Sequence, residues 1–521
     1  MPQPKVDYSL YLVTDSTPAI LGNKDLVRVV EAAVAGGVTL VQLRDKTSDT
    51  GDLIRIAKAL HEVTRAANVP LLINDRIDVA LASGVEGVHI GQDDTDYKTA
   101  RKLLGPDAII GVTANTEAEA LQAARDGADY LGVGTVFSTP TKAITKSIIG
   151  TAGVQHILSS LALQDLGHVK TVCIGGINAK NAQRVLYQTA SSTKNLDGIA
   201  VVSAIMAASD PSAAAKHLKG LVSSPPPFAT ALSNPAPTRE SIIKITPTII
   251  ARLAQTKPLA HNMTNLVVQH FAASVALAIG ASPIMSNNGL EAGDLASLGG
   301  SLLINMGTTT PEIRKNHLLA LEAYNAVGGP VVFDPVGAGA TTARREGTKA
   351  LMAGGWFSVV KGNEGEIRTV AGVEGVRQRG VDSGDAQLGL QERIKVVRDL
   401  ARRERNVVLM TGEVDVISDG TRTVSVANGH ALLGEITGSG CTLGTTVAAV
   451  LAVEREDTLM ATLAAVLLFE IAAEIAAEKA GGPGTFVPLF VDALYGLRER
   501  CKAEDGAWAE RAKVEVHELE E

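Results

Sequence analysis

Short apolar runs alternate with longer amphipathic segments along the first 222 residues. Eight such runs stand out, at 10–15, 38–44, 70–74, 87–91, 108–114, 130–134, 171–176 and 198–204. Ala-rich segments with helical periodicity separate them, for example at 25–36, 52–67 and 117–127. Eight strands that alternate with helices predict an α/β fold, a (β/α)8 TIM barrel. A doubly wound open sheet is the alternative; the count of eight and the polar residues just after strand ends favour the barrel.

A second alternating region begins at residue 241. Helical patterns occur at 241–256, 265–279, 311–326, 342–353, 390–405, 441–453, 457–479 and 487–502. Strand-like runs occur at 301–306, 330–335, 357–362, 406–412, 414–418 and 423–427. This pattern predicts a second α/β domain with helices on both faces of a mixed sheet. The acidic end of the chain, 503–521, is expected to be mostly solvated.

The two regions are separated by a segment rich in Pro, Ser and Ala and poor in charge. Its prolines favour a semi-extended spacer rather than a packed element. A chain of 521 residues is also too long for a single core. The predicted organisation is therefore a domain at 1–222, a linker at 223–240 and a domain at 241–521.

Composition narrows the class of protein. A net charge of −8 argues against a nucleic-acid-binding protein. Three widely spaced cysteines, Cys173, Cys441 and Cys501, form no C-x-x-C pair and no disulfide framework, which indicates a reducing compartment. No secretion or organelle signal is visible at the N-terminus, so we expect a cytoplasmic protein. The apolar stretch 459–474 is short for a membrane span and contains two glutamates, so we expect a buried helix and no membrane partner.

Polar residues follow the predicted strands of the first domain, where barrel enzymes place their active sites. Gln42, Arg44 and Lys46 lie at the end of the second run and share one face, because alternate strand residues point the same way. Asp75 follows the third run and Asp94 the fourth. Two carboxylates beside two cations suit Mg²⁺ that bridges to a diphosphate. Each of these residues taken alone could be a solvated loop residue, but the five together favour a site.

Further along the barrel, the segment VGTVFSTPTK offers hydroxyl groups and a lysine, and IGGI and VVSAI follow the last two runs. Gly-rich loops at that position commonly bind a phosphate group through backbone N–H groups. The first domain is therefore predicted to bind a diphosphate and a monophosphate substrate together.

These residues resemble the thiamine-phosphate synthase family over nearly all of 8–222. The motifs that carry the resemblance are YLVTD, QLRDK, IND, GVHIGQDD, YLGVGTVFSTPTK, IGGI and VVSAI. The resemblance implies that hydroxymethylpyrimidine diphosphate and thiazole phosphate combine into thiamine phosphate and diphosphate. The positive charges around the diphosphate would stabilise it as it departs, and no strong general base is needed.

The resemblance also implies roles for individual residues. Those that hold the pyrimidine diphosphate would be Gln42, Arg44, Lys46, Asn74 and Lys142. Those that hold the thiazole phosphate would be Thr139, Thr141, Gly176, Val202 and Ser203. Asp75 and Asp94 would bind Mg²⁺. Thr113 would also bind substrate; it stands where the family often has Ser, so the hydroxyl is kept.

In the second domain, the segment ITGSGC precedes a predicted helix, whose exposed N–H groups would stabilise a transferring phosphoryl group. Cys441 lies in the first turn, where the pKa of a thiol is expected to fall, and could accept a substrate hydroxyl proton. The alternative is that Cys441 is a small packed residue. Asp334, at a strand end, and Glu366 are candidate Mg²⁺ contacts, direct or through water. The sequence has no P-loop motif.

This domain resembles the hydroxyethylthiazole kinase family, which has a ribokinase-like fold, across roughly 241–500. The motifs are HNMTNLV, LAIGASPIM, DPVGAGAT, KGNEGEI, TGEVDV and ITGSGC. The resemblance implies that Met285 and Gly438 contact the thiazole, and that Lys361 and Thr411 contact ATP. Cys441 stands where ribokinase-like relatives keep a catalytic Asp. Such kinases are commonly trimers with thiazole sites between subunits, which implies a homo-oligomer, a trimer or hexamer.

The order synthase, linker, kinase is that of the fungal bifunctional enzymes of thiamine synthesis. It predicts that the kinase supplies thiazole phosphate to the synthase. One alternative is that one half only binds or regulates, as a barrel similar to thiazole tautomerase would; Arg44, Lys46, Asp75 and Asp94 argue against it. Another is that the kinase acts on a pyrimidine alcohol, but GASPIM together with ITGSGC favours the thiazole.

Overall fold

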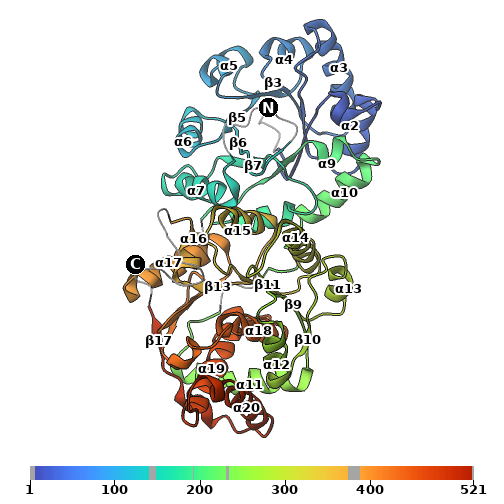
Figure 1. Ribbon diagram of the computed structural model, residues 1–521. Coiled ribbons are helices and arrows are strands. Elements are labelled where there is room, and N and C mark those ends of the chain that lie inside the picture. Colours follow the sequence, from blue (N-terminus) through green and yellow to red (C-terminus); the bar gives the residue numbers. More distant parts are fainter. Residues whose placement is uncertain (1–5, 140–147, 192, 230–233, 374–387, 519–521) are drawn as a thin grey trace. The chain divides into compact units, whose positions relative to one another are not determined.

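The computed structural model describes residues 6–139, 148–191, 193–229, 234–373 and 388–518 (Figure 1). The predicted phosphate-site residues Thr141 and Lys142 lie outside these ranges. The chain divides into two compact units, residues 1–226 and 227–521, and the division falls inside the predicted linker.

The first unit is a closed barrel of eight parallel strands in sequence order. The strands are β1 (Leu10–Val13), β2 (Leu40–Leu43), β3 (Leu71–Asn74), β4 (Gly87–Ile90), β5 (Ile109–Ala114), β6 (Tyr130–Val133), β7 (Lys170–Ile174) and β8 (Gly198–Val201). The helices are α1 (Pro18–Leu21), α2 (Leu26–Ala35), α3 (Thr50–Ala66), α4 (Ile77–Ser83), α5 (Tyr97–Leu104), α6 (Glu117–Asp126), α7 (Gly150–Leu163), α8 (Ala182–Thr189), α9 (Ser203–Met206) and α10 (Pro211–Val222). Because β8 pairs with β1, the predicted barrel is confirmed and the open sheet is excluded.

Alternate strand residues build two cores in the barrel. One set, with Leu10 and Leu12 from β1, packs outward against the helices. The other set, with Tyr11 and Val13, points inward and joins Tyr130 in a plug of large side chains. The plug fills the barrel interior beneath the carboxyl ends of the strands, so that end alone is left for a site.

The second unit contains a nine-stranded sheet of order β10-β9-β11-β12-β13-β14-β15-β16-β17. The strands are β9 (Leu259–Met263), β10 (Ser282–Ile284), β11 (Ser301–Asn305), β12 (Val331–Asp334), β13 (Val359–Asn363), β14 (Val407–Thr411), β15 (Asp415–Ser418), β16 (Thr423–Val426) and β17 (Val514–His517). From β10 to β14 the neighbours are parallel, and from β14 to β17 they are antiparallel. This is the mixed sheet that the sequence predicts.

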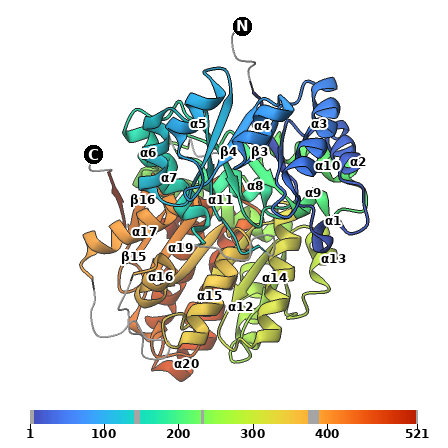
Figure 2. The same cartoon turned by 90° about the horizontal axis from the view of Figure 1, so that it is seen from above.

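Helices cover both faces of this sheet (Figures 1 and 2). They are α11 (Arg239–Thr256), α12 (Gln269–Ile279), α13 (Ala292–Ser297), α14 (Pro311–Ala326), α15 (Thr342–Gly354), α16 (Glu364–Ala371), α17 (Leu390–Glu404), α18 (Ser439–Leu451), α19 (Thr458–Ala477) and α20 (Pro483–Lys502). Val359 packs into the core beneath α18 to α20, and its neighbour Val360 packs into the core on the other face. The sheet therefore lies between two apolar layers, as continuous apolar strands require.

The long apolar helix is α19, with a mean hydropathy of 2.0 over its most apolar window and 89% of that window buried inside the molecule. It packs against α11, α18 and α20. A helix that is surrounded by others has no polar face, because every side faces apolar neighbours. The prediction of a buried core helix is confirmed.

The chain end, 503–521, is expected to be mostly solvated, and most of its described residues are exposed. It nevertheless contains ordered structure that the sequence pattern did not predict, because β17 pairs with β16 and Trp508 is 2% exposed. Val514 and Val516 pack against the core while Glu515 is exposed. A strand of four residues with only two apolar side chains carries too little apolar signal to stand out from an acidic tail.

The linker is also more packed than expected. Phe228 is 8% exposed and stacks on Trp356, with ring centroids 4.7 Å apart. Pro227 lies against Gly328. The expectation of an unpacked spacer is therefore wrong for these residues, because an aromatic side chain gains more by burial than an extended linker gains by solvation.

Candidate active sites

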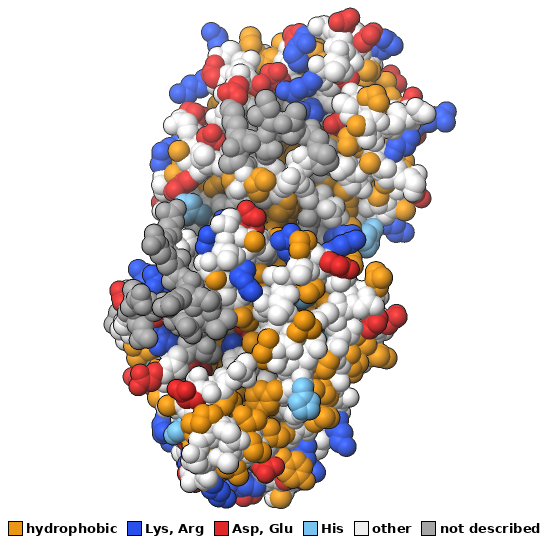
Figure 3. Space-filling model, viewed as in Figure 1, with side chains coloured by type: hydrophobic (Ala, Val, Ile, Leu, Met, Phe, Trp, Pro, Cys, Tyr) orange, Lys and Arg blue, Asp and Glu red, His pale blue; other side chains and the backbone are white. Residues whose placement is uncertain are grey.

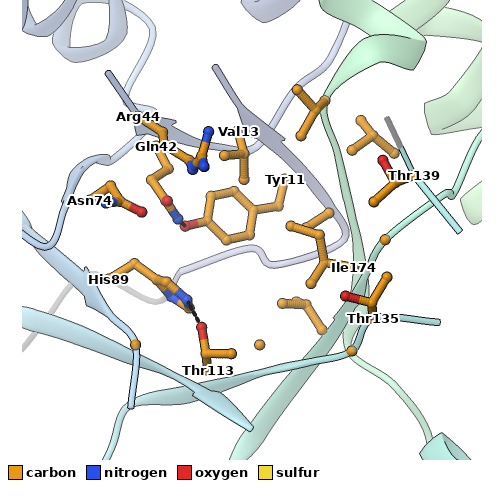
Figure 4. A pocket seen from close by; sticks show the side chains of 18 of the residues that line it. Tyr11, Val13, Gln42, Arg44, Asn74, His89, Thr113, Thr135, Thr139 and Ile174 are labelled. Atoms are coloured by element: carbon orange, nitrogen blue, oxygen red, sulfur yellow. Dashed lines mark hydrogen bonds between the residues drawn. The ribbon is translucent and has the colours of Figure 1, made fainter. Parts of the chain in front are cut away.

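A cavity of about 460 Å³ opens at the carboxyl ends of the barrel strands (Figure 4). Ten residues predicted from the sequence line it: Gln42, Arg44, Lys46, Asn74, Asp94, Thr113, Thr139, Gly176, Val202 and Ser203. They come from strands and loops spread around the barrel, and the fold alone brings them together. Figure 4 shows Gln42, Arg44, Asn74 and Thr113 around one space.

Asp75 is not among the lining residues, but it lies beside Asp94 at the rim. Partial burial and the neighbouring Asp94 carboxyl raise the pKa of Asp75, while Lys46 opposes the rise. Asp94 Oδ2 accepts a hydrogen bond from the Gly91 N–H at 2.7 Å. Two carboxyl groups so close together repel unless a proton or a cation lies between them, so the pair fits a divalent cation.

No cluster of three or more His, Cys, Asp or Glu side chains that could hold a metal occurs in the described part of the chain. A cation between Asp75 and Asp94 would therefore have to complete its coordination with substrate oxygens and water. That is the usual way in which Mg²⁺ binds beside phosphate groups.

The glycines after β7 shape the opposite wall of the cavity. Gly176 has a φ of +67°, and a Cβ there would lie 2.8 Å from the Ser138 carbonyl oxygen. Only glycine fits this position. The backbone can consequently approach a ligand closely next to Thr139, Val202 and Ser203, which also line the cavity.

Sequence reasoning missed a set of side chains at the floor of the cavity. Tyr11 and His89 line it, and hydrogen bonds connect them through Tyr130. His89 also bonds Thr113 (Figure 4). Tyr11 and His89 both lie inside motifs that carry the family resemblance, and each points inward by strand alternation, a signal that could have identified them.

In the second unit, an ion pair lies at the ends of β12 and β13. Lys361 Nζ is 3.4 Å from Asp334 Oδ2, and the two side chains are 4% and 1% exposed. Asn305 Nδ2 donates to the same oxygen at 2.9 Å. The other oxygen, Oδ1, is buried without a hydrogen-bond partner among the described residues. Burial alone would lower the pKa of Lys361, but Asp334 and Glu366 outweigh it and raise that pKa.

Cys441 lies in the first turn of α18, which begins at Ser439 after Gly438, as predicted. Asn265 Nδ2 donates to its Sγ at 3.4 Å. Burial, with Asp334 nearby, raises the pKa of the Cys441 thiol to about 11. The expectation of a lowered pKa is therefore wrong, because loss of hydration and a neighbouring carboxylate outweigh the helix dipole. Cys441 is a protonated thiol at neutral pH.

Glu366 caps a helix. Its Oε2 accepts from the Asn363 N–H and its Oε1 from the Gly337 N–H, both at 2.8 Å. The carboxylate thereby ties the Gly-rich turn after β12 to the start of α16. Burial and Asp334 raise the pKa of Glu366 to about 7. Both of its oxygens already accept backbone hydrogen bonds, so any contact with a metal would be shared or through water.

The other predicted kinase residues lie at the ends of strands of the same sheet. Thr411 ends β14, opposite Asn363 of β13. Met285 follows β10, and His261 Nε2 bonds the Ser286 carbonyl oxygen at 3.0 Å beside it. Parallel strands end at one edge, so these residues and the ion pair share that edge of the sheet.

Sequence reasoning did not identify Asn265, Asn305 or Arg344. Asn265 Nδ2 donates to Asn305 Oδ1 at 3.0 Å, which connects Cys441 to Asp334 through two amides. Arg344 donates to the carbonyl oxygens of Met306, Gly307 and Val336, in the turns after β11 and β12. Asn265 stands in the HNMTN motif, which is the signal that the sequence offers for it.

Comparisons with known proteins give the same family for each half of the chain as the sequence motifs do. A family model described as thiamine monophosphate synthase matches residues 10–205, and the hydroxyethylthiazole kinase family matches residues 250–500. The chain is 44% identical over 522 residues to the probable thiamine biosynthetic bifunctional enzyme of Schizosaccharomyces pombe, covering 99% of each chain. It is 39% identical to the thiamine biosynthetic bifunctional enzyme of Saccharomyces cerevisiae, covering 96% of this chain and 97% of that one. A solved hydroxyethylthiazole kinase from Pyrococcus horikoshii OT3 is 37% identical over 53% of this chain and all of that one, with a TM-score of 0.47.

Proposed function

This chain belongs to the family of thiamine biosynthetic bifunctional enzymes, a thiamine-phosphate synthase joined to a hydroxyethylthiazole kinase, and from that premise we propose how its residues divide the work. The barrel couples hydroxymethylpyrimidine diphosphate with thiazole phosphate. The second unit transfers a phosphoryl group from ATP to hydroxyethylthiazole. The observation that carries the proposal for the barrel is one cavity that gathers ten residues predicted from the sequence.

In the barrel, Arg44 and Lys46 bind the oxygens of the pyrimidine diphosphate, while Gln42 and Asn74 orient it. Asp75 and Asp94 would hold Mg²⁺, which adds positive charge at the departing diphosphate. The bond from the pyrimidine methylene carbon to the diphosphate oxygen breaks, and a bond to the thiazole nitrogen forms. No proton has to move, which agrees with a cavity that offers cations and amides around the reacting atoms.

The thiazole phosphate lies against the Gly-rich wall of the same cavity. Thr139 and Ser203 offer hydroxyl groups there, and Gly176 and Val202 bring backbone close to the ligand. Two further predicted residues, Thr141 for this subsite and Lys142 for the pyrimidine diphosphate, lie outside the described residues. A thiazole bound there would have to present its ring nitrogen to the pyrimidine methylene carbon, as nucleophilic attack requires.

In the kinase, Lys361 and the N-terminus of α18 at Gly438 stabilise the phosphoryl group during transfer, and Thr411 contacts the nucleotide. Asp334 and Glu366 would contact Mg²⁺ bound to ATP, which neutralises phosphate charge. Met285 contacts the thiazole. Because its thiol is protonated, Cys441 positions the substrate hydroxyl and does not act as a thiolate base.

We propose that the protein is a homo-oligomer, a trimer or hexamer, with thiazole sites at subunit borders. Leu266 and Val267, which follow Asn265, are 70% and 67% exposed, and Leu290, near Met285, is 82% exposed. Large apolar side chains beside a site favour coverage by another subunit. Light scattering of the purified protein tests this proposal, and a monomer at micromolar concentration would contradict it.

We propose that the protein is a cytoplasmic enzyme that acts on small molecules and has no nucleic-acid or membrane partner. The state of its cysteines and the distribution of its surface charges support this proposal. Cys173, Cys441 and Cys501 are all unpaired. On the face that Figure 3 shows, basic and acidic side chains are interspersed among the described residues rather than separated into one basic surface. Binding to duplex DNA at low salt would contradict this part of the proposal.

The decisive experiment supplies the purified chain with hydroxyethylthiazole, ATP, Mg²⁺ and hydroxymethylpyrimidine diphosphate. Thiamine phosphate should form, and omission of ATP should stop it unless thiazole phosphate is added directly. Omission of the pyrimidine diphosphate should leave thiazole phosphate as the product. If thiazole phosphate did not restore coupling without ATP, the proposed division between the two sites would be wrong.

A further inference from the structure

A chain of hydrogen bonds crosses the interior of the barrel beneath the cavity. Gln42 Nε2 donates to the hydroxyl of Tyr11, which bonds the Tyr130 hydroxyl at 2.8 Å. The Tyr130 hydroxyl lies 2.8 Å from His89 Nδ1, and His89 Nε2 lies 2.8 Å from Thr113 Oγ1. The two ends of this relay, Gln42 and Thr113, are both predicted to bind substrate.

The barrel makes room for the relay with two glycines. A Cβ at Gly111, beside Tyr130 in β6, would lie 2.0 Å from the Tyr130 Cζ atom. A Cβ at Gly132 would lie 2.9 Å from His89 Cε1. Neither glycine has a φ in the left-handed region, so the need here is space and not backbone freedom. Side chains at either position would displace the relay.

The direction of the hydrogen bonds follows from the donors. A phenol carries one hydrogen. Tyr11 is 1% exposed and accepts from Gln42, so its own hydrogen has the Tyr130 oxygen as its partner. Tyr130 then donates to His89 Nδ1, and the hydrogen of the neutral imidazole lies on Nε2 and goes to Thr113 Oγ1.

The direction of these hydrogen bonds fixes which group each end of the relay can offer to a substrate. Gln42 donates an amide N–H to Tyr11, which leaves its amide oxygen free to accept a hydrogen bond from the substrate. Thr113 accepts from His89, so its hydroxyl hydrogen is left to donate into the cavity. A substrate therefore meets an acceptor at Gln42 and a donor at Thr113, without either group having to rotate.

We propose that Tyr130 and His89 are positioning residues of the synthase site, which hold Gln42 as an acceptor and Thr113 as a donor toward the pyrimidine diphosphate. The inference rests on the proposed function of the barrel. Neither Tyr130 nor His89 needs to touch the reacting atoms, because they act through the two residues at the ends of the relay.

The test is Tyr130→Phe, with Tyr8→Phe as a matched control. Tyr8 is also buried, and its ring lies 5.0 Å from the Tyr130 ring, but it is not part of the relay. Tyr130→Phe should lower kcat/KM for the pyrimidine diphosphate about tenfold and change the KM for thiazole phosphate less than about twofold. Tyr8→Phe should leave both near wild type. Equal effects of the two substitutions, or an equal loss for both substrates, would overturn the proposal.

A double-mutant cycle with Thr113→Val tests whether Tyr130 acts through Thr113. In the Thr113→Val background, Tyr130→Phe should cost clearly less than the roughly tenfold expected in the wild type, because one of the two ends through which Tyr130 acts is already absent. A second full tenfold loss would show that Tyr130 does not act through Thr113. If Tyr130→Phe does not fold, as judged by circular dichroism, Tyr11→Phe breaks the same relay one bond earlier and is read in the same way.

Assays of the wild-type enzyme distinguish a wrong proposed function from a wrong proposal about the relay. If wild type does not couple the two substrates, the proposed function of the barrel is wrong. If wild type couples them and Tyr130→Phe is indistinguishable from Tyr8→Phe, only the relay is wrong. The kinase activity of the same chain, measured in each variant, should stay at the wild-type level.

Discussion

The two sites of this chain hold their charges in opposite ways. In the barrel, the Arg44 side chain is 26% exposed and Lys46 is exposed, beside an open cavity. In the kinase, Lys361 and Asp334 are almost completely buried and paired with each other. Arg44 Nη1 lies 4.0 Å from Asp15 Oδ2, but both barrel cations remain partly or fully exposed to a charged ligand, whereas the kinase charges are already part of the packed structure.

This difference predicts that charge removal has a different cost in the two units. Lys361→Met should abolish kinase activity and lower the free energy of unfolding of its unit by about 3–5 kcal/mol, because the Asp334 carboxylate is left buried without a positive charge beside it. Lys46→Met should weaken coupling while changing stability by less than about 0.5 kcal/mol. Chemical denaturation with both activities measured on each variant checks this. Equal destabilisation by the two changes would break the comparison.

The second prediction separates the two chemistries. Asp75→Ala should abolish coupling and leave thiazole phosphorylation near wild type, because the pair of carboxyl groups with Asp94 that would bind the cation is lost only in the barrel. Asp78→Ala is the control, since Asp78 pairs with Arg76 at the surface nearby and should retain coupling. Both product assays are run on both variants. An equal fall in kinase activity would mean that the sites are not separate.

The buried thiol of Cys441 gives a further, smaller test of the effect of burial at the kinase site. With a thiol pKa of about 11, Cys441 should react with iodoacetamide slowly at pH 7.5 and faster as the pH rises toward 11. Cys441→Ala should lower kinase kcat about tenfold, and KM less, because the substrate hydroxyl loses a positioned contact. Mass spectrometry and steady-state kinetics measure the two effects. An unchanged kcat would leave Cys441 as a packing residue.

The smallest effect is expected at His317 of α14. Burial lowers the pKa of His317 to about 4. The unfolded chain therefore binds the proton first, so the contribution of this residue to stability is complete above about pH 6.5 and is lost as the pH falls toward 4. His317→Leu should reduce the difference in melting temperature of the kinase unit between pH 7 and pH 5. An unchanged difference would assign the acid sensitivity to other groups.

Much of the fold could be read from local patterns. All eight barrel strands were found, because each is a short apolar run bounded by turn residues. In the second unit, β10 was missed because it has three residues, includes Pro283 and is partly exposed. The strand β9 was also missed in the sequence, because its residues, LAHNM, include two polar side chains that are buried in the structure. Apolar periodicity cannot reveal a strand whose polar side chains are satisfied by tertiary contacts.

In the candidate sites, too, the sequence revealed some residues and missed others. Charged and glycine-containing motifs pointed to the ligand-facing residues, since few other functions need those residue types in that order. The supporting residues Tyr130, Asn305 and Arg344 were not found, because a tyrosine, an asparagine or an arginine has no distinctive spacing along the chain. The pairs Tyr130–His89, Asn305–Asp334 and Arg344–Gly307 are separated by 41, 29 and 37 residues along the chain.

The order of amino acids by itself determined the repeating strand and helix pattern, the two-domain plan and the kinds of group that meet the substrates. Folding decided how the charges behave. Exposure at the barrel rim keeps cations available, while burial at the kinase sheet edge pairs Lys361 with Asp334 and raises the pKa of Cys441. The physical reason is that hydration and distance govern charge, and both are properties of three-dimensional packing that a linear pattern does not contain.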